Sequence, residues 1–180
     1  MLIGVMKNKA IHSSISLFSL ACAAFVFAGC GPSGDKSSSS GDSGASADAA
    51  PGEVTQTIEI TANDQMKYNL ERFMVEAGST VKIHLKNVGT MPKMSMGHNV
   101  VVLKQGADEK AFVEAAIQAP ANDYIPPEMT DAVVAHTKML GGGEEDSVVF
   151  KVPTKTGNYT FLCSFPGHYQ VGMKGTMIVK

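Results

Sequence analysis

The chain has 180 residues, a length that suits one folded domain and leaves little for a second. Apolar residues make up 44% of it, which is enough for a packed core, and the formal net charge is −2. Because phosphate contacts need clustered lysine and arginine, the absence of a basic cluster argues against nucleic-acid binding.

Residues 1–29 predict a secretory signal peptide. A basic start, an apolar run over residues 15–27 and two small residues precede Cys30. The run is shorter than the roughly 20 apolar residues that a membrane-spanning helix needs. This layout resembles the lipobox of bacterial lipoproteins, in which the cysteine is acylated and becomes the mature N-terminus. By that resemblance Cys30 anchors the protein on the periplasmic side of the envelope, with the outer membrane favoured because Gly31 follows; plain secretion is the alternative.

A flexible tether is predicted over residues 30–53. These residues are mostly glycine, serine, alanine and aspartate, so burial cannot offset the entropy cost of ordering them. A chain of this length has a typical end-to-end reach of roughly 25 Å. The folded domain is therefore expected over residues 54–180.

Short segments rich in β-branched or alternating residues dominate this domain and predict strands. The expected strands cover residues 57–60, 73–75, 81–85, 99–103, 147–152, 158–163 and 176–179. Turn residues separate these strands, a spacing that is typical of an all-β sandwich or small barrel.

One segment interrupts the β pattern. Residues 108–118 place apolar side chains at helix-like spacing and predict a short helix. Three prolines between residues 120 and 127 predict irregular structure after it.

The densest chemical pattern lies in residues 163–173. Cys163, His168 and Met173 occur within eleven residues, and a proline–glycine pair forces a turn between the first two. A thiolate, two imidazoles and a weak thioether are the donors of a type 1 (blue) copper site for electron transfer. His98, at a turn before an apolar strand, is the best candidate for the second imidazole.

With these motifs, residues 54–180 resemble the azurin and auracyanin branch of the cupredoxins. Matching segments follow in the same order at residues 63–66, 96–99, 135–138, 143–148 and 173–176. The resemblance implies a Greek-key β-sandwich and one copper ion that alternates between Cu(II) and Cu(I). It also implies a monomeric single-electron carrier, not an enzyme, whose partners are redox proteins such as cytochromes or copper and haem enzymes.

The resemblance further implies a role for each ligand. His98, Cys163 and His168 would form the trigonal plane around copper. Met173 would be the long axial ligand, and the carbonyl of Gly97 would be a weak contact opposite it.

Residues around the ligands also receive roles by resemblance. Asn99 would bond near Ser164 and tie the two ligand loops together, while backbone amides around Asn99 and Phe165 would donate to the Cys163 sulfur. An apolar collar around an exposed edge of His168 would form a partner-docking patch, made of Met66, Met91, Met96 and Phe165.

Three features depart from azurin. Four residues separate His168 from Met173 where azurin has three, a spacing nearer to auracyanin and plastocyanin. Asn87 stands where azurin has a second, copper-free histidine. Ser79 replaces one cysteine of azurin's disulfide.

Other interpretations remain open from the sequence. Cys163 alone would more often be a buried core cysteine, and a Cys163–His168 catalytic dyad is a rival that lacks an orienting partner. A copper chaperone or storage protein is one alternative, because the 11 methionines of the chain offer soft ligands for Cu(I). A lipid-anchored interaction module that binds no metal is another. His84 and His136 are interpreted as ordinary strand and surface histidines.

Overall fold

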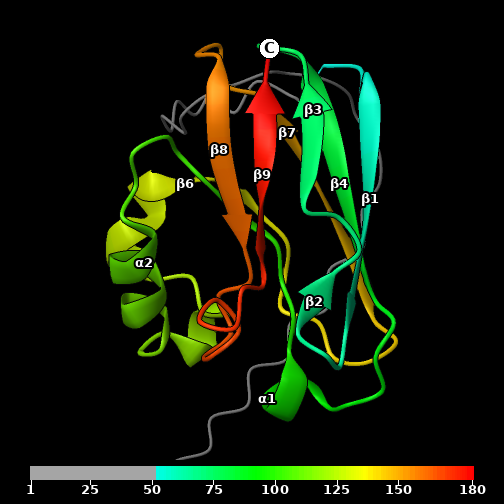
Figure 1. The fold of residues 1–180 in the computed structure, drawn as a ribbon, viewed down its shortest axis with the longest axis vertical. Coiled ribbons are helices and arrows are strands. Elements are labelled where there is room, and N and C mark those ends of the chain that lie inside the picture. The colour runs from blue at the N-terminus through cyan, green and yellow to red at the C-terminus, as the bar shows by residue number, and fades with distance from the viewer. Residues whose placement is uncertain (1–51) are drawn as a thin grey trace, which may run out of the picture. The chain divides into compact units, whose positions relative to one another are not determined.

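Two β-sheets face each other across a hydrophobic core in the computed structural model, which describes residues 52–180 (Figure 1). The first sheet has the order β2-β1-β4-β7, with β1 (Gln56–Asn63), β2 (Lys67–Tyr68), β4 (Thr80–Asn87) and β7 (Glu145–Lys151). The second has the order β3-β9-β8-β5-β6, with β3 (Arg72–Val75), β5 (Val101–Leu103), β6 (Val133–His136), β8 (Gly157–Leu162) and β9 (Lys174–Val179). The predicted all-β sandwich is confirmed.

Alternating burial explains how the first sheet forms. β1 and β4 run parallel, with Ile58 beside Ile83 and Ile60 beside Leu85, and all four side chains are buried. Burying side chains of this size contributes about 1.5–3 kcal/mol each. Because successive strand residues point to opposite faces, the polar residues between them face away from the core.

All seven predicted strands correspond to observed strands, although their ends differ by a few residues. The sequence prediction missed β2 and β6. β2 has only two residues, too few to show a periodic pattern. β6 follows the proline-containing segment and pairs with β5 through an irregular register, so its position depends on contacts that are distant in sequence.

A short helix, α2 (Glu109–Ala116), confirms the predicted helical insertion and is shorter than expected by one residue at its start and two at its end. The side chain of Asp108 caps it by accepting hydrogen bonds from two backbone amides, each 3.0 Å long. Phe112 is fully buried against Leu103 and Leu162, so the helix covers one part of the second sheet.

The proline-containing segment is more regular than predicted. It forms two 3-10 helices, η1 (Pro120–Asn122) and η2 (Pro127–Ala132), each of which has proline in its first turn. Proline is compatible with that position because no intrahelical donor is needed there. A further helical turn, α1 (Lys93–Met96), was not predicted.

The predicted signal peptide, Cys30 and nearly all of the tether lie outside the described residues. Within residues 52–180, no helix is long and apolar enough to span a membrane.

Candidate metal centre

Two loops at one end of the sandwich carry the candidate ligands. His98 lies between α1 and β5, while Cys163 directly follows β8 and Met173 directly precedes β9. Figure 1 shows α1 and the turn between β8 and β9 at the same end of the domain. Residues that are 65 positions apart in sequence are therefore brought to one place by the sheet topology.

Three of the predicted donors converge. One ligand atom from each of His98, Cys163 and His168 lies within 4.8 Å of the other two, and all three residues are buried. The Cys163 sulfur lies 3.4 Å from Nδ1 of His168, and the two imidazole centroids are 4.9 Å apart. This spacing allows one small cation to contact all three atoms.

The turn from 163 to 173 is closed by its own backbone. The Cys163 amide donates to the Met173 carbonyl over 3.1 Å, and the Met173 amide donates to the His168 carbonyl over 2.9 Å. Gly167 and Gly172 adopt φ angles of 88° and 92°, a region that side chains with a Cβ disfavour. The sequence therefore folds this run back on itself, and Met173 is buried beside Cys163.

The His98 loop is held as tightly. Its backbone exchanges two hydrogen bonds with Leu140, of 3.0 and 2.8 Å. A Cβ on Gly97 would lie 2.7 Å from the Lys93 carbonyl and 2.9 Å from the Met139 sulfur, so only glycine fits there. The Gly97 carbonyl oxygen is 3.9 Å from the Cys163 sulfur.

A buried side-chain bridge joins the two loops. The Asn99 amide donates to the Ser164 hydroxyl over 2.8 Å, and the Ser164 backbone amide donates to the Asn99 side-chain oxygen over 2.9 Å. Asn99 also donates to the Asp123 carbonyl over 3.2 Å. These bonds fix the distance between the two ligand loops.

Burial sets the protonation of the three donors. It lowers the pKa of His98 and lowers that of His168 to about 4, where the neighbouring His98 adds a repulsive contribution. Burial also raises the pKa of the Cys163 thiol to about 11, although hydrogen bonds at the Asn99 and Phe165 backbone oppose this rise. At neutral pH both imidazoles are unprotonated and can bind a metal, whereas the thiol must lose its proton to do so.

His98 supplies the test of whether a metal fits. It is fully buried, yet neither ring nitrogen forms a hydrogen bond of ordinary geometry within the described residues. A contact with the Asn63 backbone offsets only part of the burial effect that lowers the pKa of His98. A buried polar atom without a hydrogen bond lowers the stability of the fold. A cation bound between His98, the Cys163 thiol and the second imidazole would give a ring nitrogen of His98 a partner. Copper suits this donor set.

The chain is similar to known copper proteins across the described domain. Its residues 54–180 match the family of copper binding proteins of the plastocyanin/azurin type. The chain belongs to the plastocyanin/azurin family. Members of this family carry electrons and are not enzymes, and the site is of the type 1 copper kind.

Individual relatives agree with this membership. The chain is 42% identical over 121 residues to azurin of Achromobacter denitrificans, covering 66% of this chain and 80% of that one. It is 43% identical over 121 residues to outer membrane protein H.8 of Neisseria gonorrhoeae, covering 65% of this chain and 63% of that one. The crystal structure of dithionite-reduced auracyanin from Roseiflexus castenholzii matches with a TM-score of 0.63 and 38% identity, covering 71% of this chain and 98% of that one.

The predicted docking residues lie around this end with unequal exposure. Met91 is 39% exposed, while Met66, Met96 and Phe165 are half-buried. The Phe165 ring lies 4.7 Å from that of His168. The exposed edge expected for His168 is small, because only 2% of this residue is accessible.

Histidines interpreted as ordinary do not join the centre. His84 bonds to the Ser147 hydroxyl over 2.9 Å on the first sheet, and His136 is exposed on β6. Asn87 is fully buried and supports the chain turn by accepting from the Gly89 amide over 2.9 Å. Each has a structural role that needs no metal.

Two neighbours of the centre were missed from the sequence. The Tyr68 hydroxyl donates to the Asn99 carbonyl, one residue after the candidate ligand His98. Tyr124 packs edge-on against Phe165, with ring centroids 5.3 Å apart. Tyr68 belongs to the two-residue strand β2 and Tyr124 to an irregular segment, so neither carried a periodic signal.

Proposed function

We propose that this protein carries single electrons between redox proteins of the cell envelope, using one copper ion held by His98, Cys163, His168 and Met173. The observation that carries the proposal is the buried convergence of one sulfur and two imidazoles within 4.8 Å. Copper held by these donors supplies one-electron chemistry, as Cu(II) and Cu(I).

The ligand set divides between the two loops. His98, Cys163 and His168 would supply the three close donors, and Met173 would supply a fourth, weaker sulfur donor. The Gly97 carbonyl, which lies 3.9 Å from the Cys163 sulfur, would be a further weak contact. Because both loops are fixed by backbone hydrogen bonds, the ligands would keep one arrangement in both oxidation states of the copper ion.

Hydrogen bonds around Cys163 would change the electron density on its sulfur. Backbone amides near Asn99 and Phe165 would donate to it, and the Asn99–Ser164 bridge would hold them in position. Such outer contacts set the electron density on a ligand and therefore the reduction potential of the metal.

The docking patch consists of Met66, Met91, Met96 and Phe165. By the family resemblance these apolar side chains would lie around His168, and the Phe165 ring is 4.7 Å from the His168 ring. The ring of His168 would then give the path for the electron between the ligand set and a partner. Small apolar interfaces suit transient encounters between redox proteins. Partners of this kind are cytochromes or copper and haem enzymes. The protein would meet them as a monomer.

Lipidated Cys30 would hold the domain at the membrane, with residues 30–53 as a tether. The similarity to outer membrane protein H.8 supports an envelope location, and the outer membrane is favoured. Replacement of Cys30 by serine should release the protein into the soluble periplasmic fraction. Recovery of that variant with the membranes would contradict the anchor.

Spectra of the purified domain loaded with Cu(II) test the central proposal. A carrier should show intense blue absorption and a narrow copper hyperfine splitting, the signature of a copper–thiolate bond. A colourless protein that binds Cu(I) reversibly would instead indicate a chaperone or storage protein. Failure to bind copper at all would leave the metal-free interaction module.

Electron self-exchange tests the docking patch without a known partner. Two copies must meet through this patch, so Met91→Lys should bring like charges together and slow self-exchange about tenfold, an effect of about 1.4 kcal/mol. Val149→Lys, at an equally exposed position on β7, is the matched control and should leave the rate unchanged. Equal slowing in both variants would argue against the patch.

A further inference from the structure

A single carboxylate at the start of α2 contacts both ends of the turn that carries two of the candidate ligands. The Glu109 side chain accepts a hydrogen bond from the Tyr169 hydroxyl over 2.8 Å and another from the Lys174 ammonium over 2.9 Å, both at the same oxygen. Tyr169 directly follows the candidate ligand His168 in the chain. Lys174 directly follows the candidate ligand Met173. The carboxylate therefore reaches the chain one residue beyond each of these two ligands.

The two donors are also in contact with each other. The Lys174 Nζ atom lies 4.6 Å from the centroid of the Tyr169 ring and 3.3 Å from its hydroxyl oxygen. The same ring packs against the apolar cluster that α2 forms with the second sheet, which includes Phe112 and Leu162. Charge-assisted hydrogen bonds are roughly twice as strong as neutral ones, so this three-way contact joins the helix firmly to the turn.

The middle of the turn is exposed, in contrast to its ends. Residues 170–172 are all exposed, and Val171 is 59% accessible. Gly172 adopts a φ angle of 92°, and a glycine loses more backbone freedom on ordering than any other residue. The Met173 amide closes the turn by donating to the His168 carbonyl over 2.9 Å. The contacts with Glu109 add a hold on both ends of this segment from a separate element of the fold.

We propose that Glu109 is a positioning residue: through the two donors that follow them, it holds His168 and Met173 in their ligand positions. This inference rests on the proposed copper site, because it takes these two residues as ligands. The carboxylate acts from outside the ligand set. It holds the turn already in the copper-free protein, so that little movement of the two ligands would be needed when a metal binds.

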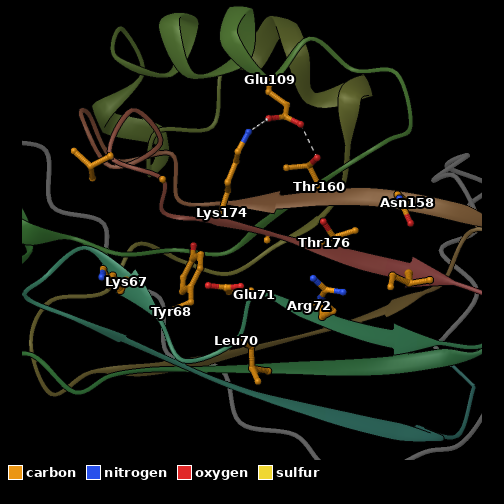
Figure 2. A pocket seen from close by; sticks show the side chains of 14 residues that line it. Lys67, Tyr68, Leu70, Glu71, Arg72, Glu109, Asn158, Thr160, Lys174 and Thr176 are labelled. Carbon is orange, nitrogen blue, oxygen red and sulfur yellow. Dashed lines mark hydrogen bonds and ion pairs between the residues drawn. The ribbon is translucent and has the colours of Figure 1, made fainter.

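Thr160 provides the comparison that distinguishes this role from attachment of the helix alone. Its hydroxyl donates to the other oxygen of Glu109 over 2.6 Å, and Thr160 lies on β8. Figure 2 shows Glu109 between Thr160 and Lys174, on the wall of a cavity of about 670 Å³. Thr160 ties the carboxylate to the sheet, whereas Tyr169 ties it to the turn. If Glu109 only attached α2 to the domain, loss of either hydroxyl would have the same effect.

Tyr169→Phe and Thr160→Val each remove one of these hydroxyls. In the copper-free protein, deuterium exchange of the Met173 amide measures how often the turn opens. Tyr169→Phe should accelerate this exchange about tenfold, as expected for the loss of one hydrogen bond to a charged acceptor. Thr160→Val should leave the exchange close to the natural rate. Amides of β4, which exchange when the whole domain unfolds, show how much overall stability each variant loses.

The copper-loaded proteins supply a second readout. Both variants should remain blue, because the thiolate is unchanged. Tyr169→Phe should broaden the copper hyperfine lines, since two of the ligands then vary more in position. Thr160→Val should keep the natural line width.

Lys174→Gln removes the second contact with the turn and should act in the same direction as Tyr169→Phe. With 44% of the Lys174 side chain accessible, this variant should fold even if the first one does not. Exchange at Met173 that responds equally in the two hydroxyl variants, or in neither, would overturn the inference, as would unchanged hyperfine lines in Tyr169→Phe and Lys174→Gln. A natural protein that binds no copper would instead overturn the proposed function, and the exchange comparison would still show whether Glu109 holds the turn.

Discussion

Two polar clusters in this domain join distant parts of the chain, and they differ in how their polar atoms are paired. At the metal centre, both ring nitrogens of His98 are buried without a hydrogen bond of ordinary geometry within residues 52–180. Glu109, the first residue of α2, is fully paired: it accepts from Thr160 over 2.6 Å, from Tyr169 over 2.8 Å and from Lys174 over 2.9 Å. Figure 2 shows two of these contacts, to Thr160 and Lys174.

The two clusters also differ in whether they favour charged or neutral side chains. Burial lowers the pKa of His168 to about 4, so the metal centre disfavours positive charge on its imidazoles. The Glu109 cluster favours charge: its hydrogen bonds lower the pKa of Glu109 against the effect of burial, and Glu109 in turn raises the pKa of Lys174. A paired cluster ties the helix to the sheet, whereas an unpaired buried one requires an external partner.

Removing the sulfur should have the largest effect. Cys163→Ser takes away the thiolate, so the blue absorption should disappear completely, because that colour arises from the copper–thiolate bond. His136→Ala, which changes an exposed histidine on β6, should keep the full colour. Loss of colour in the second variant would mean that the ligands are assigned wrongly.

Acidification should have the next largest effect, and it should distinguish the metal centre from the Glu109 cluster. The pKa of His168 is about 4 in the folded protein and about 6.5 when unfolded, so the unfolded chain binds more protons between these values. Stability without copper should therefore fall by about 3 kcal/mol as the pH drops through this window. Urea unfolding at several pH values measures the loss, and His168→Gln should remove the part that His168 contributes, leaving only the part from His98, whose pKa burial also lowers.

The Glu109 cluster should respond in its own pH range. Glu109→Gln removes charge-assisted hydrogen bonds and should lower the free energy of unfolding by about 1–2 kcal/mol at pH 7. Since the folded pKa of Glu109 lies below its ordinary value of 4.5, this difference should vanish only as the pH falls through that lower value. Glu114→Gln, at an exposed position on the same helix, should change little. The blue colour should persist in both variants.

An exposed ion pair should have the smallest effect. Lys93 and Asp123 approach to 3.1 Å at the rim of the metal centre, with 45% and 33% of their side chains accessible. Such pairs contribute about 0–1 kcal/mol. Lys93→Ala should therefore shift the urea midpoint only slightly and leave the copper spectrum unchanged. A loss of unfolding free energy as large as that of Glu109→Gln would contradict the distinction between exposed and partly buried pairs.

The sequence predicted what depends on local pattern. Strands such as β4, with its alternating Val81, Ile83 and Leu85, and helix α2, with its apolar face, follow from periodicity alone. The donors also followed from local spacing, because residues 163–173 hold three of them in one turn. His98 was chosen because it lies at a turn before an apolar strand, and the resemblance to a family then assigned it a place among the copper ligands.

Contacts made by short or irregular segments escaped prediction. The donation from Tyr68 to the Asn99 carbonyl joins a two-residue strand to a loop, and neither element has a period that a sequence could reveal. Asp123 and Tyr124 adopt consecutive left-handed conformations, with φ angles of 52° and 58°, which no pattern in the proline-containing segment indicated. The limited exposure of His168 likewise depends on several loops meeting at once.

The complete burial of Cys163 has a consequence for the chemical lifetime of the protein. An alkylating reagent or an oxidant can reach this sulfur only when the two ligand loops separate, because none of its surface is accessible in the closed arrangement. The rate at which such a reagent modifies Cys163 therefore reports how often the loops open. A bound ion that bridges the loops would slow this modification and so protect the same sulfur that holds it.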